Sequence, residues 1–162
     1  MNKKKILFLN RSAMIAAVYI VLTFAAAAFG LASGAIQVRL SEMLTILPYY
    51  TLSAVPGITI GCLLSNILTG SGLLDIIFGT LATLLGALGS YALRRHKWLV
   101  PLPPILANTI IVPLVLKASG FREGLPFLMA TVGIGEVISC GLLGMLLLFV
   151  LKKYKRALFA DN

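Results

Sequence analysis

Five long apolar stretches, separated by short basic or turn-forming segments, dominate this sequence. They cover residues 12–30, 43–74, 75–93, 98–116 and 124–151. Of the 162 residues, 59% are hydrophobic and only 12% are charged, whereas a soluble domain is about half apolar and about a quarter charged. With so few polar side chains a soluble fold could not cover its surface, so lipid must surround most of the chain. The sequence predicts an all-α integral membrane protein.

The second stretch is too long for one membrane span. Its 32 residues would form a helix of about 48 Å, against a hydrocarbon core of about 30 Å. Pro56 and Gly57 interrupt this stretch, so we expect two short helices there. The chain then forms a single membrane domain, residues 1–162, with six transmembrane helices. The expected spans are 12–30, 42–55, 56–69, 73–93, 99–117 and 124–151. Four prolines, Pro101, Pro103, Pro104 and Pro113, should bend or partly unwind the start of the fifth span.

The basic residues predict the topology of these spans. An even number of spans places both termini on one side of the membrane. If that side is the cytoplasm, eleven of the 14 Lys and Arg residues are cytoplasmic, and only Arg39, Lys117 and Arg122 are external, as the positive-inside rule requires. The first span is not expected to be a signal peptide, because Asn10 to Ser12 interrupt it and its removal would reverse this charge bias.

Several classes of function lack the residues they need. The net charge of +9 does not indicate nucleic-acid binding, because the basic clusters flank apolar runs without interleaved aromatic residues. No phosphate-binding G-x-x-x-x-G-K-[ST] motif is present. The single histidine, His96, lies in a basic loop, and neither a Ser-His-acid set nor H-E-x-x-H occurs. Cys62 and Cys140 lie in apolar runs as expected of packing residues, so we predict no disulfide, metal, cofactor or catalytic residue.

Six polar residues inside or beside the apolar spans are the predicted binding residues. They are Arg39, Glu42, Asn66, Asp75, Asn108 and Glu136. The first four are expected at the outer ends of their spans, and the last two about 15 to 18 Å deeper. A carboxylate at that depth costs about 3 kcal/mol or more and persists where it faces a cavity or a partner. The set predicts a polar cup that opens outward.

Each of these residues also has a simpler explanation. Asp75 can cap the positive end of its helix. Arg39 and Glu42 can form an interfacial ion pair. The two asparagines can hydrogen-bond between helices, and Glu136 can serve as an interhelical contact.

Small or hydroxyl-bearing residues accompany the acids on their helix faces. The two sets are Asp75, Gly79 and Thr83, and Gly133, Glu136, Ser139 and Cys140. Small side chains leave room for a ligand or for close helix contact. Because three acids and one arginine are embedded, the site should favour a ligand rich in N–H donors or positive charge.

Ala13 and Ala17 lie four residues apart in the first span. Small residues at this spacing are typical of tight helix contact in lipid. The contact is either internal packing or an interface with a partner protein.

Three segments carry a family resemblance: QVRLSEMLTILPYY, PGITIGCLLSNILTGSGLLDIIFGTLATL and TVGIGEVIS. Through them the chain resembles the QueT family of queuosine-precursor transporters, which are substrate-binding S components of energy-coupling factor (ECF) transporters. The resemblance covers nearly the whole chain and is specific at residues 39–42 and 66–83. The proline-rich start of the fifth span matches no motif.

The resemblance implies an S-component-like bundle in a prokaryotic cell membrane that captures a 7-deazaguanine base from outside. An EcfT-like transmembrane coupling subunit and two cytoplasmic ATPase subunits would drive import, so the chain itself is not expected to be an enzyme. Ala13 and Ala17 would face the coupling subunit. The resemblance also implies that the whole S component tips over in the membrane.

The predicted site suits such a base. Adjacent N–H and amino donors of a guanine-type edge can bind one carboxylate in bidentate fashion. We expect Glu136 to bind the base edge and Asp75 or Glu42 to bind the amine of an aminomethyl precursor, with the other predicted residues completing the set.

Two alternatives remain open from the sequence. The chain could be an S component for another small nutrient, such as a vitamin, which binding measurements would distinguish. It could also be a small membrane enzyme or a channel, which would show product formation or ligand flux without partner subunits.

Overall fold

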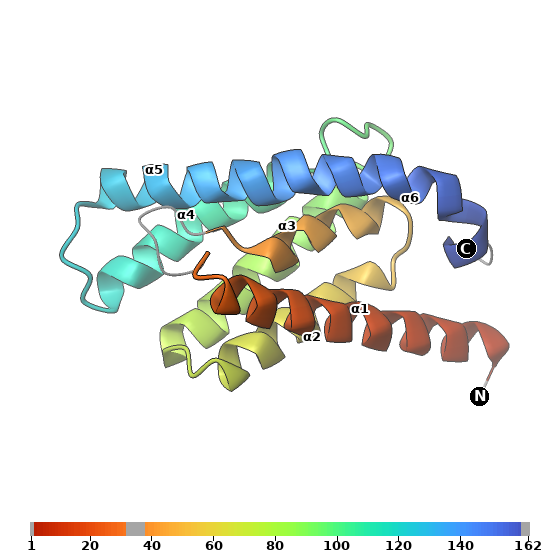
Figure 1. Ribbon diagram of the computed structural model, residues 1–162, viewed down its shortest axis with the longest axis horizontal. Coiled ribbons are helices and arrows are strands. Elements are labelled where there is room, and N and C mark those ends of the chain that lie inside the picture. Colours follow the sequence, from red (N-terminus) through yellow and green to blue (C-terminus); the bar gives the residue numbers. More distant parts are fainter. Residues whose placement is uncertain (1, 32–37, 160–162) are drawn as a thin grey trace.

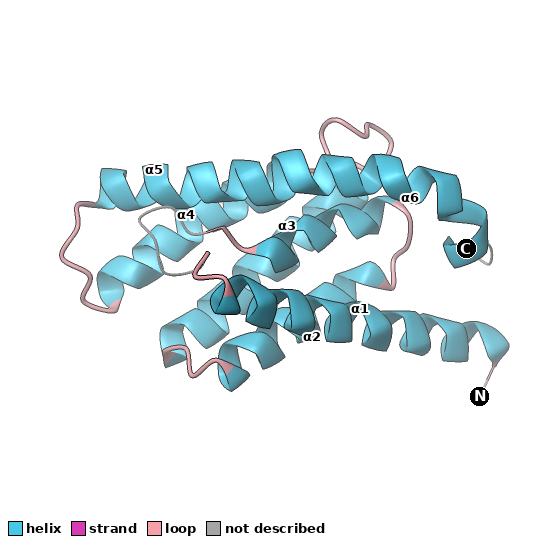
Figure 2. Ribbon diagram, viewed as in Figure 1, coloured by secondary structure: helices cyan, strands magenta, loops and turns pink. Residues whose placement is uncertain are grey.

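The structure is a computed structural model and describes residues 2–31 and 38–159. Residues 1, 32–37 and 160–162 lie outside the described part. The described residues form helices joined by loops (Figure 2). In chain order the elements are α1 (Lys3–Ala28), η1 (Leu40–Tyr49), α2 (Ala54–Leu68), η2 (Asp75–Gly79), α3 (Thr80–Ala92), α4 (Leu102–Ala118), α5 (Leu125–Glu136), η3 (Val137–Leu143) and α6 (Gly144–Phe159).

The short element η1 lies at the centre of the bundle. It is a 3₁₀-helix and contacts α1, α2, α3, η3 and α6. Around it, α1 packs against α2, α2 against α3, α3 against α4, and α4 against α5. The elements α5, η3 and α6 form one long rod, and α1 begins at the same end of the bundle at which α6 ends (Figure 1).

Three helical segments in the described chain are long and apolar enough to cross a membrane: Lys3–Ala28, Asp75–Ala92 and Leu125–Lys155. The helices α2 and α4 are also apolar but shorter. The ten residues of η1 span only about 20 Å at the 3₁₀ rise. Large hydrophobic side chains lie exposed on the outer surface, including Met14, Leu73 and Leu142. The fold is therefore that of a helical membrane protein, and the six-span topology stays a prediction.

The chain break in the second apolar stretch lies at residues 50–53 and not at Pro56-Gly57 as expected. Pro56 lies in the first turn of α2, where its missing N–H needs no partner within the helix. A Cβ atom at Gly57 would lie 2.7 Å from the carbonyl oxygen of Ser12. The glycine therefore allows close contact between α1 and α2, and the dipeptide marks a helix start rather than a break.

Two helices differ in detail from the expected spans. The helix α1 begins at Lys3, where the Asn2 side chain caps it, so it extends beyond the expected span at 12–30. The Ser12 hydroxyl lies within this helix and donates to the carbonyl oxygens of Phe8 at 3.0 Å and Ser53 at 2.9 Å. The helix α4 is α-helical from Leu102 onward and contains Pro113. The first three prolines lie at its cap and first turn, where proline is tolerated.

Close helix contacts at glycines fix the walls of the bundle. A Cβ atom at Gly61 of α2 would lie 2.7 Å from the Tyr19 Cβ atom of α1. A Cβ atom at Gly86 of α3 would lie 2.7 Å from the Pro104 Cα atom of α4. Any side chain at either position would separate the two helices, so these glycines set how closely the polar residues approach one another.

Two π-helical turns, η2 and η3, occur next to predicted site residues. A π turn contains more residues than an α turn, so it rotates the residues before it relative to those after it. The spacing of four that aligns Asp75 with Thr83 on a regular helix therefore no longer holds across η2. Such turns often occur at functional sites.

Candidate functional site

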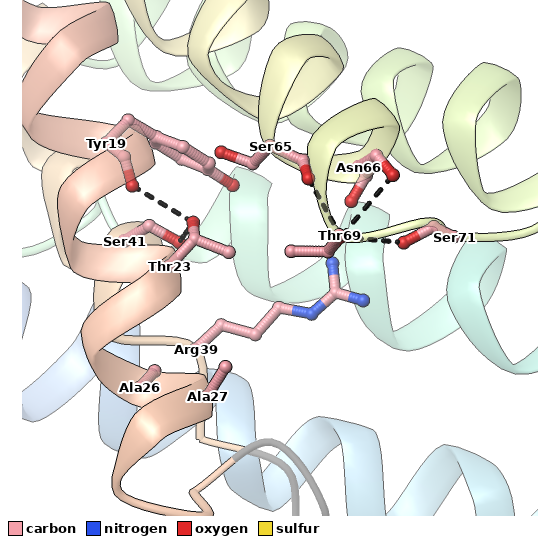
Figure 3. A pocket seen from close by; sticks show the side chains of 10 residues that line it. All are labelled: Tyr19, Thr23, Ala26, Ala27, Arg39, Ser41, Ser65, Asn66, Thr69 and Ser71. Carbon is pink, nitrogen blue, oxygen red and sulfur yellow. Dashed lines mark hydrogen bonds between the residues drawn. The ribbon is translucent and has the colours of Figure 1, made fainter.

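A cavity of about 210 Å³ lies between α1, the start of η1 and the end of α2. Its lining is rich in hydroxyl groups and small residues: Tyr19, Thr23, Ala26, Ala27, Arg39, Ser41, Ser65, Asn66, Thr69 and Ser71 (Figure 3). Pockets for drug-sized ligands usually measure about 300 to 1,000 Å³. This cavity therefore suits a smaller molecule.

Arg39 is the cationic residue of this cavity. Its side chain extends from the start of η1 in the direction of Thr69, the residue after α2 (Figure 3). The wall beside it is braced by hydrogen bonds, because Thr23 Oγ1 lies 3.0 Å from Ser41 Oγ and Thr69 Oγ1 lies 3.2 Å from Ser71 Oγ. The guanidinium group supplies N–H donors for a carbonyl oxygen.

The carboxylate of Glu42 lies deeper and is completely buried. The Tyr19 hydroxyl donates to its Oε1 atom. Thr83 Oγ1 donates to Oε1 at 3.5 Å, and Asn108 Nδ2 donates to Oε2 at 3.5 Å. These donors come from α1, α3 and α4, so three helices converge on one side chain of η1. A charge in the interior requires such partners.

Glu136 lies beside Glu42 and is 5% exposed. The Cys140 thiol, one turn further along, donates to Glu136 Oε2 at 3.2 Å. A carboxylate oxygen of Glu42, a carboxylate oxygen of Glu136 and the Sγ atom of Cys140 all lie within 4.8 Å of one another. Two carboxylates at this distance repel each other, so the pair favours a cation or a group with several N–H donors between them.

Tyr19 joins the cavity to the carboxylate pair. Its side chain lines the cavity, and its hydroxyl donates to Glu42. Gly61 packs against the Tyr19 ring and fixes its position. The phenol therefore stands between the cavity and the buried acids.

Asn66 connects the cavity to the backbone of Asp75. Asn66 lines the cavity, and its Nδ2 atom donates to the carbonyl oxygen of Asp75 at 3.3 Å and to Cys62 Sγ at 3.6 Å. The Asp75 carboxylate turns back toward Gly72 at the start of its helix, where a Cβ atom would lie 3.5 Å from Oδ2. This placement fits the helix-terminus explanation of Asp75.

Five of the six predicted binding residues form two groups, and the Asp75 carboxylate belongs to neither. Glu42, Asn108 and Glu136 meet in the buried cluster, whereas Arg39 and Asn66 line the cavity above Tyr19. Glu42, which was expected at the outer end of its span beside Arg39, has a completely buried side chain because η1 lies inside the bundle.

Ala13 and Ala17 lie on the exposed side of α1, whereas Ser12 and Ala16 on its other side are buried. The described part of the chain therefore does not use the alanine pair for internal packing.

Sequence reasoning missed Tyr19 and the polar role of Cys140. A signal for Tyr19 was present, because Ser12, Tyr19 and Thr23 fall on one face of α1 at spacings of seven and four. Cys140 was expected to be a packing residue, but its thiol also contacts Glu136 and Thr45. A cysteine four residues after a glutamate on a helix has the same sequence pattern whether it packs in the core or binds the acid, so the sequence does not distinguish these roles.

Apolar helices around paired acids are typical of helical membrane proteins that handle a polar solute. The fold and the buried cluster place this chain in that class. The QueT transporter family matches residues 9–153, and the chain belongs to this family.

A curated relative is named the queuosine precursor transporter QueT of Lactococcus lactis subsp. cremoris (strain MG1363). It is 35% identical over 98 residues. The match covers 60% of this chain and 57% of the relative, so the chain spans a little over half the length of that protein. No solved structure matches the chain.

Proposed function

We propose that this chain is the substrate-binding S subunit of an ECF-type importer and that it captures a queuosine precursor, a 7-deazaguanine base, from outside the cell. Membership of the QueT transporter family and the relative named as a queuosine precursor transporter support this proposal. The observation that carries it is the pair of buried carboxylates below a polar cavity.

The chemistry of the base matches the two groups of site residues. A guanine-type edge has adjacent N–H and amino donors, which one carboxylate accepts in bidentate fashion, and we assign this role to Glu136. The nearby Glu42 then accepts the amine of an aminomethyl precursor. Arg39 and Asn66 meet the carbonyl oxygen or ring nitrogens from the cavity, and Asn108 orients Glu42.

Tyr19 controls access in this proposal. Because its hydroxyl already donates to Glu42, a ligand that reaches the carboxylate replaces this bond. The guest must therefore bring donors of its own, which favours an N–H-rich base over an apolar or anionic solute.

Energy for import comes from partner subunits. Ala13 and Ala17 lie exposed on α1, which supports their assignment as the contact surface for an EcfT-like transmembrane subunit. Two cytoplasmic ATPase subunits complete the importer, and both termini of this chain lie in the cytoplasm.

The test is a titration of the purified chain in detergent with 7-deazaguanine bases, with and without the aminomethyl group, beside guanine, thiamine, riboflavin and biotin. We expect saturable binding of the deazaguanines and much weaker binding of the vitamins. Binding of a vitamin with no detectable binding of the deazaguanines would reject the assigned substrate. Ligand flux in liposomes without partner subunits would reject the S-subunit role.

A further inference from the structure

A second cavity, of about 230 Å³, lies near the end of α6, far along the rod from the start of α5. Three lysines and two tyrosines contribute to its lining: Lys97, Lys152, Lys155, Tyr49 and Tyr50. None of these residues belongs to the candidate site described above. Basic residues line both cavities, but only the first adjoins a buried acid, through the hydrogen bond from Tyr19 to Glu42.

The lysines of this basic cavity come from separate parts of the chain. Lys97 lies in the loop between α3 and α4, whereas Lys152 and Lys155 are three residues apart on α6 and so share a helix face. Among the described lining residues none is acidic. Three lysines around one cavity create a positive potential that attracts an anion. The arrangement is therefore complementary to an anion.

Exposed aromatic side chains border the basic cavity. Phe149 lines the cavity and packs against Trp98, with ring centroids 5.8 Å apart. The Lys97 Nζ atom lies 5.2 Å from the Trp98 ring and 5.5 Å from the Phe149 ring. Trp98 is 65% exposed, as is typical of tryptophan at a membrane–water interface. An anion that binds here has an apolar surface immediately beside it.

Aromatic and hydrogen-bond contacts support the part of the cavity wall that the two tyrosines form. Tyr49 and Tyr50 pack edge to face at 4.8 Å, and the Tyr50 hydroxyl donates to the carbonyl oxygen of Leu148 at 2.6 Å. The hydrogen bond ties the end of η1 to α6. The tyrosine pair therefore gives the site a preformed wall.

We propose that the basic cavity binds the phosphate of an anionic phospholipid headgroup. Lys97, Lys152 and Lys155 contact the phosphate, and Trp98 and Phe149 contact the glycerol and upper acyl region. Basic pockets between membrane helices on the cytoplasmic side bind anionic headgroups in this way. A soluble phosphate compound shares the headgroup chemistry but makes no use of the aromatic border.

The experiment measures lipid binding to the purified full-length chain by native mass spectrometry. Phosphatidylglycerol is compared with phosphatidylcholine of the same acyl chains, and inorganic phosphate is added as a competitor. The α6 double variant carries Lys152→Gln and Lys155→Gln. The control is the α1 double variant, Lys3→Gln with Lys4→Gln, which removes the same charge from exposed residues of α1.

We expect the wild-type chain to prefer phosphatidylglycerol. The affinity of the α6 double variant for phosphatidylglycerol should be lower by a factor of about ten or more. The affinity of the α1 double variant should stay within about twofold of the wild-type value. An equal loss in both double variants, or no preference between the two lipids, would overturn the proposal. Displacement of the lipid by inorganic phosphate at similar affinity would assign the site to a soluble phosphate instead. Because neither variant touches the candidate substrate site, deazaguanine binding reports separately on the proposed function.

Discussion

The side chain of Glu42 is completely buried, so its hydrogen-bond partners come from the protein. Tyr19, Thr83 and Asn108 each donate a hydrogen bond to the carboxylate. A ligand with an amine gains a charge-assisted hydrogen bond only if the negative charge is present. The negative charge of Glu42, and not only the shape of its side chain, should therefore determine the affinity for such a ligand.

We predict that Glu42→Gln lowers affinity for the aminomethyl precursor by about tenfold or more, equivalent to about 1.4 kcal/mol. The substitution keeps the shape of the side chain, so the fold should remain intact. Titration of the purified variant measures the effect, with Glu123→Gln as a control because Glu123 is an exposed acid in a loop. Unchanged affinity in the Glu42 variant would remove this residue from the binding site.

Glu136→Gln should lower the affinity for every 7-deazaguanine base by about tenfold or more, because we assign Glu136 to the base edge. This includes the base without the aminomethyl group. Comparison of the two ligands on the two variants separates the roles of the acids. If the ligand without the amine bound both variants normally, the assignment of Glu136 would be wrong.

Several site residues could be predicted because polar side chains are rare in these spans. Glu42, Asn108 and Glu136 stood out for this reason, and the structure brings them together. The complete burial of Glu42 could not be predicted, because it depends on η1 lying inside the bundle. Tyr19 was missed because an amphipathic tyrosine in an apolar helix is usually an interfacial anchor.

At the scale of the elements, the hydropathy pattern predicted helical segments but not their local geometry. Long apolar runs lead to helices because lipid cannot satisfy backbone groups. The 3₁₀ geometry of η1 and the π turns η2 and η3 depend on tertiary contacts, which no periodicity records. The position of the break at residues 50–53 was also missed, since Pro56 is equally compatible with a helix start.

The contact between α1 and α2 should depend on Gly61. A Cβ atom there would lie 2.7 Å from the Tyr19 Cβ atom, so Gly61→Ala must move α1 or the tyrosine ring. We expect the variant to be less stable by about 1 to 3 kcal/mol and to bind the precursor more weakly. Thermal unfolding in detergent measures the first effect and ligand titration the second.

Gly141→Ala is the control for this prediction. A Cβ atom at Gly141 would have its nearest neighbours at 3.7 and 3.9 Å, which are ordinary contacts. Equal unfolding temperatures for the two variants would contradict the close packing of α1 on α2.

The exposed face of α1 should matter for transport and not for binding. Ala13→Trp adds a large side chain to this face, so we expect normal precursor affinity but loss of uptake when the coupling subunits are present. Ala130→Trp places the same change on an exposed position of α5 and should leave uptake intact. Normal uptake by the Ala13 variant would show that the alanine pair is not the partner surface.

At the scale of the whole molecule, the basic clusters and the arrangement of the helices indicate the same orientation in the membrane. The helix α1 begins and α6 ends at one end of the bundle, so the lysines at 3–5 and at 152–155 belong to the same end (Figure 1). We propose that this end faces the cytoplasm, as the positive-inside rule requires. The lysine-lined cavity near the end of α6 then meets the inner leaflet.

Cysteine labelling in whole cells tests this orientation. We expect Ser119→Cys, in the loop after α4, to react with an impermeant maleimide from outside, and His96→Cys to react only after permeabilisation. Both positions are exposed, and the native Cys62 and Cys140 are buried, so the background should be low. Labelling of His96→Cys in intact cells would reverse the proposed topology.

The most direct test of the central claim, that the buried carboxylates bind an N–H-rich guest, is a structure of this chain with a 7-deazaguanine base bound. We expect the edge of the base within hydrogen-bond distance of Glu136, its aminomethyl group at Glu42, and the Tyr19 hydroxyl moved away from Glu42. A base bound elsewhere, with the bonds from Tyr19, Thr83 and Asn108 to Glu42 unchanged, would contradict the claim.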